Sequence, residues 1–363
     1  MVKERDLQIV VLADLSTTNG ANIVTKLLIS ELERLNQEVT LFDSSVKEHK
    51  FYALRRVLAF VICYSRLRKI QQIEILYIPL AAGMASFFQM LILLFIKKRC
   101  QRILVHHHSY KAISMNPSLI EKIVHFFLSK YAEHIFLGEK MMIEYSEIWR
   151  PRKRNWILLN AGFAASRIAI SNPSSSGQFK NSPTFLHYGK LTLEKGTLTA
   201  LSAFNEILSA SEFGQCILAG PTVQPKILTE IRNLQKKFTK RFHYIEAFDL
   251  DRLNEFLERS DFLLFPSTYN VEASPLVVLE SQAAGLIAVT SDVGCLSQDV
   301  ISPGSVLQID NWNRDCNEVL SRYFLDWNQE TLNFVSLASN GIKAEMTSRA
   351  MITFTQIREI FHG

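Results

Sequence analysis

The chain has few cysteines, and none of the five forms a C-x-x-C pair with another. This scatter indicates neither a zinc site nor a disulfide framework, and it fits a reducing compartment. The sequence also lacks low-complexity tracts and internal repeats. Hydrophobic residues make up 48% and charged residues 21% of the 363 residues, which is typical of a globular protein and excludes a disordered chain.

Long hydrophobic runs are missing as well. The N-terminus, MVKERD, continues into a strand-like stretch without the apolar segment of a secretory signal. The most apolar stretch, 85–96 (ASFFQMLILLFI), precedes Lys97-Lys98-Arg99 and is shorter than the roughly 20 residues of a membrane-spanning helix. We expect a helix packed on a sheet, and the alternative is an interfacial helix beside basic anchors. The sequence therefore predicts a cytoplasmic protein, with peripheral attachment to the inner face of the cell membrane as an open alternative.

Positive charge is concentrated in the first half of the chain. Residues 1–165 hold 23 Lys and Arg against 14 Asp and Glu, whereas the remainder holds 17 against 21, for a net charge of +5. This asymmetry favours an anionic partner of the first half, namely a membrane surface, a phosphorylated acceptor or nucleic acid. A solvated basic face is the alternative.

Short β-rich runs alternate with helical stretches, which is typical of βα units that wind a parallel sheet. The predicted strands are 7–13, 38–42, 75–79, 102–107, 134–137 and 156–159, then 184–188, 215–219, 243–245, 262–265 and 287–290. We therefore predict an α/β protein of two Rossmann-like domains, 1–168 and 183–330. The turn-rich segment 169–182 is the predicted linker. Residues 331–363 are predicted to be helices that pack back toward the first domain.

Two glutamates follow the predicted strand at 262–265. Glu272 lies in the loop after the strand, and Glu280 lies in the next helix, for which Pro275 is a suitable first-turn residue. Loops at the carboxyl ends of parallel strands bind ligands, and helix N-termini offer free amides. Two carboxylates in this arrangement can accept hydrogen bonds from sugar and ribose hydroxyls. The structural alternative is a plain loop residue and a solvated helix position.

This E-x7-E segment, followed by the A-x-G turn at 283–285, resembles the hallmark of the retaining glycosyltransferases of family 4. The segment 189–196 (GKLTLEKG) is similar to the G-R-L-x-x-x-K-G signature that begins the family's second domain. Asn160-Ala161-Gly162 is similar to the N-G turn that closes the first domain, and Ala219-Gly220-Pro221 lies where the family has a Gly-rich strand end. The matching segments follow the expected order over most of the chain.

The resemblance implies a GT-B fold, in which the two domains face each other over a deep cleft. It also implies a hexosyltransferase that moves a sugar from a nucleoside diphosphate sugar to a glycan or lipid-linked acceptor with retention. Surface polysaccharide synthesis, of lipopolysaccharide or capsule, is the expected setting. No metal, no other cofactor and no nucleic acid partner are expected. A GT-B nucleotide-sugar epimerase and a catalytically silent subunit of a polysaccharide assembly complex remain the alternatives.

The family match assigns the donor diphosphate to Lys190 and Lys195, with Gly189 at the start of their loop. Lysine at 190, where the family has arginine, keeps the charge and loses the bidentate fork. A solvated loop is the structural alternative for this pair.

Glu272 matches the glutamate beside the donor sugar, and Glu280 matches the one that binds ribose. Ala273, Ser274 and Pro275 are expected to bind the donor through their backbone. Because Ala273-Ser274 replaces the family's Gly-Phe, the sugar pocket has a different wall here.

In the first domain, a strand ends at His106-His107-His108. The family places a histidine near the donor sugar and phosphate at this point, and we favour His108, then His107. Alternation puts His106 and His108 on one face of the strand and argues against a shared metal ion. A structural role is the alternative for each.

A weaker signal follows the first strand, where Asn19 and Gly20 stand in place of the family's Gly-Gly pair near the diphosphate. The lone glycine does not make a G-x-G-x-x-G fingerprint, which argues against an oxidoreductase.

Overall fold

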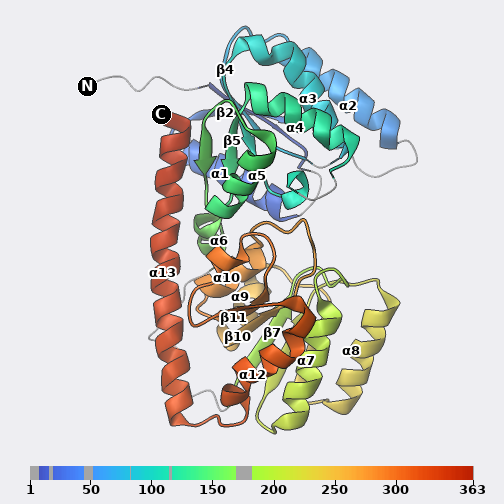
Figure 1. The fold of residues 1–363 in the computed structure, drawn as a ribbon, viewed down its shortest axis with the longest axis vertical. Coiled ribbons are helices and arrows are strands. Elements are labelled where there is room, and N and C mark those ends of the chain that lie inside the picture. The colour runs from blue at the N-terminus through green and yellow to red at the C-terminus, as the bar shows by residue number, and fades with distance from the viewer. Residues whose placement is uncertain are drawn as a thin grey trace. The chain divides into compact units, whose positions relative to one another are not determined.

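The structure is a computed structural model of the chain, and it describes residues 8–15, 19–44, 52–81, 83–113, 117–168 and 182–362. The predicted linker 169–182 falls, except for its last residue, outside the described residues. The chain divides into two units, 1–159 with 354–363, and 160–353. Figure 1 labels the elements of both.

The first unit is built on a parallel sheet with the strand order β2-β1-β3-β4-β5-β6. Its strands are β1 (Gln8–Ala13), β2 (Glu38–Asp43), β3 (Ile73–Pro79), β4 (Cys100–His106), β5 (Glu133–Phe136) and β6 (Asn155–Ile157). Its helices are α1 (Gly20–Arg34), α2 (Tyr52–Leu67), α3 (Met84–Ile96), α4 (Leu119–Tyr131) and α5 (Glu139–Trp149), with short 3-10 turns η1 (Lys97–Arg99) and η2 (Tyr110–Ala112). Strands β3 and β4 lie in the middle of the sheet. They are apolar because helices cover a parallel sheet on both faces and bury its central strands.

The apolar stretch 85–96 forms α3 and packs on this sheet. Met90, Ile92, Leu93 and Ile96 are buried in one core cluster with side chains of the sheet, of α2 and of α4. The prediction of a packed helix is therefore confirmed. None of the helices in the described part of the chain combines the length and the apolar character needed to cross a membrane.

The second unit is built on another parallel sheet, with the order β12-β11-β10-β7-β8-β9. Its strands are β7 (Thr184–Tyr188), β8 (Gln215–Ala219), β9 (Phe242–Ile245), β10 (Phe262–Phe265), β11 (Ile287–Ser291) and β12 (Ser305–Leu307). Its helices are α6 (Ala161–Arg167), α7 (Thr197–Ala210), α8 (Pro225–Lys237), α9 (Leu250–Arg259), α10 (Leu276–Ala283), α11 (Leu296–Asp299) and α12 (Trp312–Phe324), with a short 3-10 turn η3 (Ile309–Asn311).

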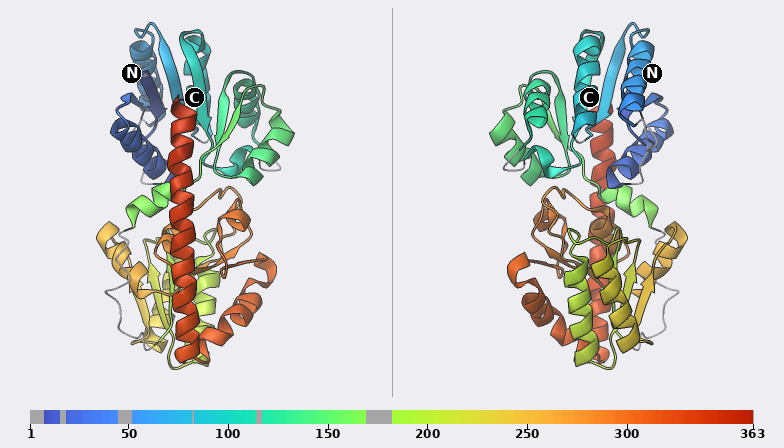
Figure 2. Two further views of the ribbon diagram at one scale, coloured as in Figure 1. Left: turned by 90° about the vertical axis from the view of Figure 1, so that its left-hand side faces the viewer. Right: turned by 90° about the vertical axis from the view of Figure 1, so that its right-hand side faces the viewer.

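The chain ends in one long helix, α13 (Gln329–His362), which Figure 2 shows unbroken from end to end. Its last turns belong to the first unit, where Arg102 Nη1 donates to the carbonyl of Ile360 at 2.8 Å and the Phe361 ring lies 5.8 Å from that of Tyr77. Its earlier turns belong to the second unit.

The boundary between the units also differs from the sequence pattern, which placed it at residue 168. Helix α6 packs against α10 of the second unit, and the amide of Gly162 donates to Thr353 Oγ1 at 3.0 Å. The first unit therefore ends at Leu159. Local composition marks the turn-rich segment that follows α6, whereas packing decides to which core α6 belongs.

Candidate functional site

Three loops of the second unit are joined by backbone hydrogen bonds at the carboxyl edge of its sheet. They follow β7, β8 and β10. The amide of Gly189 donates to Ala219 O at 3.0 Å, and that of Leu191 donates to Pro221 O at 3.1 Å. The amide of Thr268 donates to Glu194 O at 2.8 Å. The loop after β7 is thus fixed to both of its neighbours, which gives its side chains defined positions.

Two glycines allow this close approach. Gly220 has φ +140° and Gly196 has φ +72°. A β-carbon at Gly220 would lie 1.7 Å from the Gly189 carbonyl oxygen, and one at Gly196 would lie 1.8 Å from that of Pro266. Since both neighbours are backbone atoms in sheet-bound loops, neither can move aside cheaply.

The substitution Gly220→Ala is therefore expected to destabilise the second unit by about 2–5 kcal/mol, through the clash and the positive φ. Urea unfolding gives the change in the free energy of unfolding, and hydrogen exchange resolved by segment shows whether the loss falls on the second unit. Gly341→Ala is the matched control, because no atom lies within 4 Å of its β-carbon position in α13. That change should instead stabilise the protein by about 0.5–1 kcal/mol. Equal effects of both substitutions would contradict the close approach.

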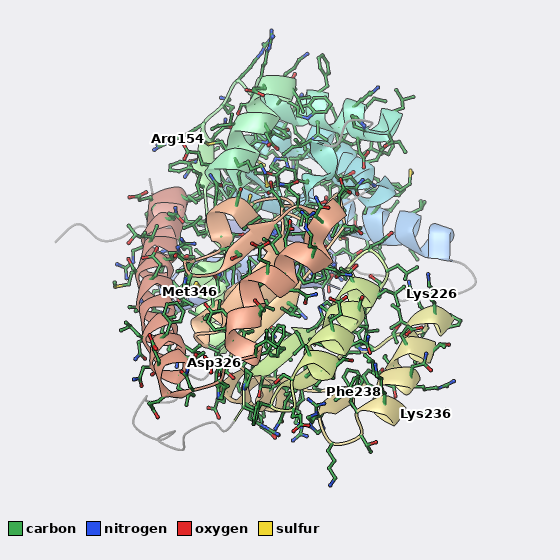
Figure 3. All side chains as sticks on the ribbon, turned by 60° about the horizontal axis from the view of Figure 1, so that its bottom comes forward. Arg154, Lys226, Lys236, Phe238, Asp326 and Met346 are labelled. Atoms are coloured by element: carbon green, nitrogen blue, oxygen red, sulfur yellow. The ribbon has the colours of Figure 1, made fainter. Side chains whose placement is uncertain are left out.

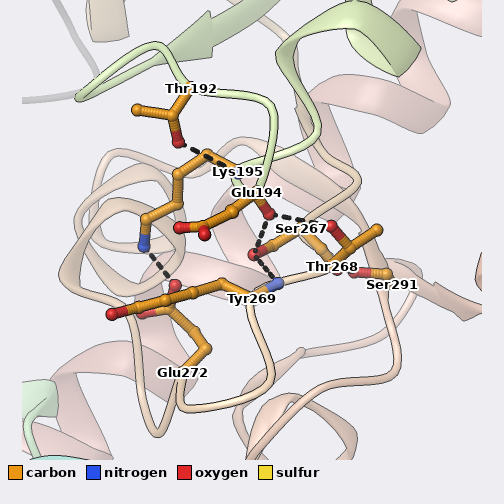
Figure 4. Close-up of polar contacts among 8 residues, drawn as sticks. All are labelled: Thr192, Glu194, Lys195, Ser267, Thr268, Tyr269, Glu272 and Ser291. Carbon is orange, nitrogen blue, oxygen red and sulfur yellow. Dashed lines mark hydrogen bonds and ion pairs between the residues drawn. The ribbon is translucent and has the colours of Figure 1, made fainter.

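Lys195 and Glu272 form an ion pair between the loop after β7 and the loop after β10 (Figure 4). Their side chains are 28% and 12% exposed. The ammonium group also faces the rings of Tyr269 and Phe265, with Nζ 5.4 and 5.7 Å from the ring centroids. The structure thus brings together one predicted diphosphate ligand and the predicted sugar-binding glutamate in a half-buried setting. An ammonium group there attracts an anion more strongly than it would in open water.

Lys190 belongs to the same loop as Lys195 and is exposed. It makes no ion pair with any residue that the structure describes. Its charge is therefore free to meet an anion from solvent. Gly189, just before it, has φ +116° and leads the chain away from β7.

The loop that carries Glu272 continues through three residues that are fixed by their backbone. The buried Ala273 accepts a hydrogen bond from the amide of Cys295 at 2.8 Å, and the carbonyl of Ser274 accepts one from Asn160 Nδ2 at 3.2 Å. Pro275 has φ −69° and ψ 124° and is the cap that precedes α10, whereas the sequence placed it in the first turn. Its extended ψ accounts for this shift of one residue.

Glu280 is buried within α10 rather than solvated. Tyr188 Oη lies 3.1 Å from Glu280 Oε2 and 3.0 Å from the carbonyl of Val277, and Arg167 Nε lies 3.1 Å from Oε1. Burial raises the pKa of Glu280, and the charge of Arg167 opposes that rise. The sequence analysis missed both partners. Tyr188 could have been found from its place directly before Gly189, but no sequence signal connects Arg167 to Glu280.

An open hollow lies beside this cluster, at the start of α9, and was also missed. Phe248, Asp249 and Arg252 are among the residues that line it. The ring of Phe248 lies 6.3 Å from that of Tyr188. One lining residue of the hollow, Phe248, thus contacts Tyr188, the partner of Glu280.

In the first unit, the three consecutive histidines have different surroundings. His106 is fully buried, with Nδ1 2.7 Å from Tyr77 Oη, and its ring centroid lies 3.9 Å from that of His108. The predicted alternation is therefore correct. His107 points into an aromatic cluster, where its Nε2 lies 2.8 Å from His134 Nδ1.

His108 is the least buried of the three, and yet its Nε2 is enclosed and has no hydrogen-bond partner among the residues described. Burial lowers the pKa of His108 to about 3, so the imidazole is neutral at pH 7. A neutral ring with an unused nitrogen can donate to, or accept from, a ligand. The Nε2 of His107 is engaged by His134, and His106, whose Nε2 is likewise unpaired among the described residues, is fully buried. His108 is therefore the better candidate.

Asn19 and Gly20 begin helix α1. The side chain of Asn19 caps the helix by accepting from the amide of Asn22 at 2.9 Å, and Gly20 is the first helical residue. Capping accounts for Asn19 without a ligand. Across the described ranges, no three His, Cys, Asp or Glu side chains converge as a metal site.

Comparisons with known proteins bear on the second unit first. Residues 170–321 match the family described as glycosyl transferases group 1. The match contains Lys190, Lys195, Glu272 and Glu280. A glycogen synthase of Mycobacterium tuberculosis is 28% identical over 170 residues, which are 46% of this chain and 39% of that protein. The chain thus matches well under two thirds of this relative's length.

Solved structures resemble both units. Sucrose-phosphate synthase of Thermosynechococcus elongatus aligns with a TM-score of 0.73 at 14% identity, over 98% of this chain and 99% of that one. HepE of Anabaena, solved in complex with UDP-glucose, aligns with a TM-score of 0.70 at 15% identity, again over 98% and 99%. Such likeness shows a shared fold, and the predicted α/β GT-B architecture of two Rossmann-like units is confirmed.

Proposed function

We propose that the protein is a retaining glycosyltransferase of family 4 that uses a nucleoside diphosphate sugar as donor. The observation that carries this proposal is the Lys195–Glu272 pair on interlocked loops at the carboxyl edge of the sheet. The group 1 match over the same loops and the UDP-glucose complex of HepE support it.

The two lysines are the proposed ligands of the donor diphosphate. As the sugar leaves, negative charge grows on the diphosphate, and fixed ammonium groups stabilise it. Glu272, released from Lys195 by the incoming phosphate, would then accept hydrogen bonds from the sugar hydroxyls. No metal is required in this scheme.

Glu280 is the proposed ribose ligand. A tyrosine hydroxyl has one proton, and Tyr188 Oη has two acceptors within reach, Glu280 Oε2 and Val277 O. If Tyr188 turns to Val277, Oε2 becomes free to accept from a ribose hydroxyl without leaving a buried group unpaired. The adjoining hollow at Phe248 would take the base by stacking.

His108 is the proposed contact of the first unit with the donor, by family resemblance and because its enclosed Nε2 is unused. Gly20 and Asn19 are proposed to lie near the diphosphate by family resemblance alone. The acceptor is proposed to be a glycan or a lipid-linked saccharide of a surface polysaccharide pathway. Its hydroxyl would attack from the side on which the diphosphate departs, and a phosphate oxygen would take its proton.

A thermal-shift screen of nucleotide sugars tests the donor proposal. A donor at 100 times its Kd should stabilise the protein by about 2.7 kcal/mol and raise Tm. The shift should survive chelation of divalent ions, and it should shrink in Glu272→Gln but not in the control Glu230→Gln, an exposed change on α8. A shift that EDTA abolishes would overturn the metal-free scheme, and a panel without any shift would overturn the donor class.

A further inference from the structure

Helices α2, α3 and α4 form one continuous layer on the first sheet (Figure 1). The rings of Phe60 and Phe88 join α2 to α3 at 5.5 Å, and α3 packs along α4. The inner sides of all three helices supply the core cluster on one side of the sheet. Their outer sides therefore make one surface, which we call the outer helical face.

The outer helical face is unusually apolar for an exposed surface. Leu58 is 56% exposed on α2, Phe95 61% on α3, and Phe126 60% on α4. Ile62 and Ile123 are also exposed on α2 and α4. Because α3 is mostly buried, its two neighbours carry most of these side chains. The sequence drew attention to α3, but its apolar character serves the core.

The charge of this face has one sign. Residues 57–72, from within α2 to the start of β3, hold Arg66, Arg68 and Lys69 and no acidic residue, and residues 84–99 hold Lys97, Lys98 and Arg99 and again no acid. Helix α4 has a single acid, Glu121, which is buried and paired with Lys111 at 2.9 Å. Among the described residues of the three helices, no exposed acidic side chain offsets this positive charge.

Two lysines of the face lie over aromatic rings. Lys97 Nζ is 3.8 Å from the ring centroid of Tyr131, and Lys130 Nζ is 3.8 Å from that of Phe126. Each side chain then presents an apolar stem and a charged tip on the same surface. This is the arrangement that side chains adopt at a membrane interface.

We propose that the outer helical face docks on the surface of an anionic phospholipid bilayer. Apolar side chains of α2 and α4 enter the headgroup region, while the lysines and arginines meet lipid phosphates. A soluble polyanion would neutralise the positive charge, but it would not bury the exposed rings of Phe95 and Phe126. The inference extends the membrane-linked acceptor proposed above and does not depend on sugar transfer.

Flotation of the full chain with two kinds of vesicle tests the proposal. The protein should float with vesicles of phosphatidylcholine and phosphatidylglycerol at low salt, and not with phosphatidylcholine alone. The double variant Leu58→Ser with Phe126→Ser, and the double variant Lys98→Glu with Lys122→Glu, should each bind about tenfold more weakly.

Matched controls change the same residue types elsewhere. Leu337→Ser with Ile352→Ser alters two exposed apolar positions of α13. Lys226→Glu with Lys236→Glu reverses two charges on α8, and these two lysines are labelled in Figure 3. These proteins should float like the wild type. Circular dichroism melting confirms that each variant folds.

Three results would overturn the docking proposal. The first is that the wild-type protein fails to float with anionic vesicles. The second is that the control variants lose as much binding as the face variants. The third is that the wild type is a dimer which the face variants dissociate, while their flotation stays unchanged. The last result would make the face a contact between copies. A donor-induced thermal shift that persists in a protein that does not float would reject the docking alone. A protein that floats but shows no thermal shift with any nucleotide sugar would reject the donor proposal alone.

Discussion

Replacing Lys195 by methionine is expected to lower kcat for sugar transfer by about 100- to 1000-fold, the usual cost of removing one preorganised charge-stabilising group. Methionine keeps the length and apolar stem of the side chain and removes the ammonium group. Since charge on the diphosphate grows as the bond to the sugar breaks, the loss should fall on kcat more than on KM. Initial rates over a range of donor concentrations separate the two.

The Lys195→Met protein should remain folded. The side chain of Glu272, its ion-pair partner, keeps 12% of its surface exposed, so water can enter the space of the missing ammonium group and solvate the carboxylate. Lys226→Met on α8 is the matched control and should keep full activity, while Lys195→Arg should retain part of it, because the charge stays. A normal kcat in Lys195→Met would remove the diphosphate role from this residue and leave the ion pair as a structural contact.

The sequence pattern predicted most of the fold, because parallel strands buried on both faces are short apolar runs between helices. The segment Ser305–Leu307 escaped prediction. It is three residues long and half-buried, and it pairs with β11 at the edge of the sheet. Such a strand is fixed by its neighbour, and its own residues carry little β signal.

Site residues on signature loops could be predicted, and those that reach the site from elsewhere could not. Lys195 and Glu272 lie in segments whose spacing is distinctive, and the structure brings them into contact. Arg167 meets Glu280 only because α6 packs on α10, which no local pattern records. The sequence suggested membrane contact only through residues 85–96 and the basic first half. It could not identify the outer helical face, since burial decides which apolar residues of α2 and α4 remain exposed.

Mild acid is expected to destabilise the first unit strongly, because its sheet encloses a cluster of neutral histidines. Burial lowers the pKa of His108 and His134 to about 3 and that of His125 to about 4, and it lowers those of His106 and His107 well below the usual value. His125 is also near the carboxylate of Glu121, which raises its pKa slightly against this trend, and the other neighbours within the cluster are histidines and neutral aromatic residues.

The sign follows from proton binding. These pKa values are lower in the folded state than the value of about 6.5 in an unfolded chain, so the unfolded state binds more protons below pH 6.5. The stability from neutral histidines is complete above that pH and is lost as the pH falls toward 3. At pH 5, a histidine with a folded pKa of about 3 has lost about 2 kcal/mol. The losses at His108 and His134 act in the same direction, and the whole stability of a domain is only about 5–15 kcal/mol.

The second unit should respond differently. Burial lowers the pKa of its own His187 to about 4, but burial also raises the pKa of Asp299 to about 7. A carboxyl group whose pKa is raised on folding binds protons preferentially in the folded state, so Asp299 adds stability as the pH falls from 7 toward 4. The two contributions oppose each other, and the first unit is expected to open first.

Urea unfolding at pH 7 and pH 5, with hydrogen exchange resolved by segment, measures the difference. We expect one transition to separate into two at pH 5, with exchange in β3–β6 ahead of exchange in β7–β11. His134→Gln removes one titrating ring and should flatten the pH dependence of the first unit, although it also lowers stability at pH 7. His362→Gln, at an exposed position, should not alter it. If the second unit opened first, or if His134→Gln kept the wild-type slope, the buried histidines would not be the acid-labile element, and the protonation of carboxylates would have to explain the loss.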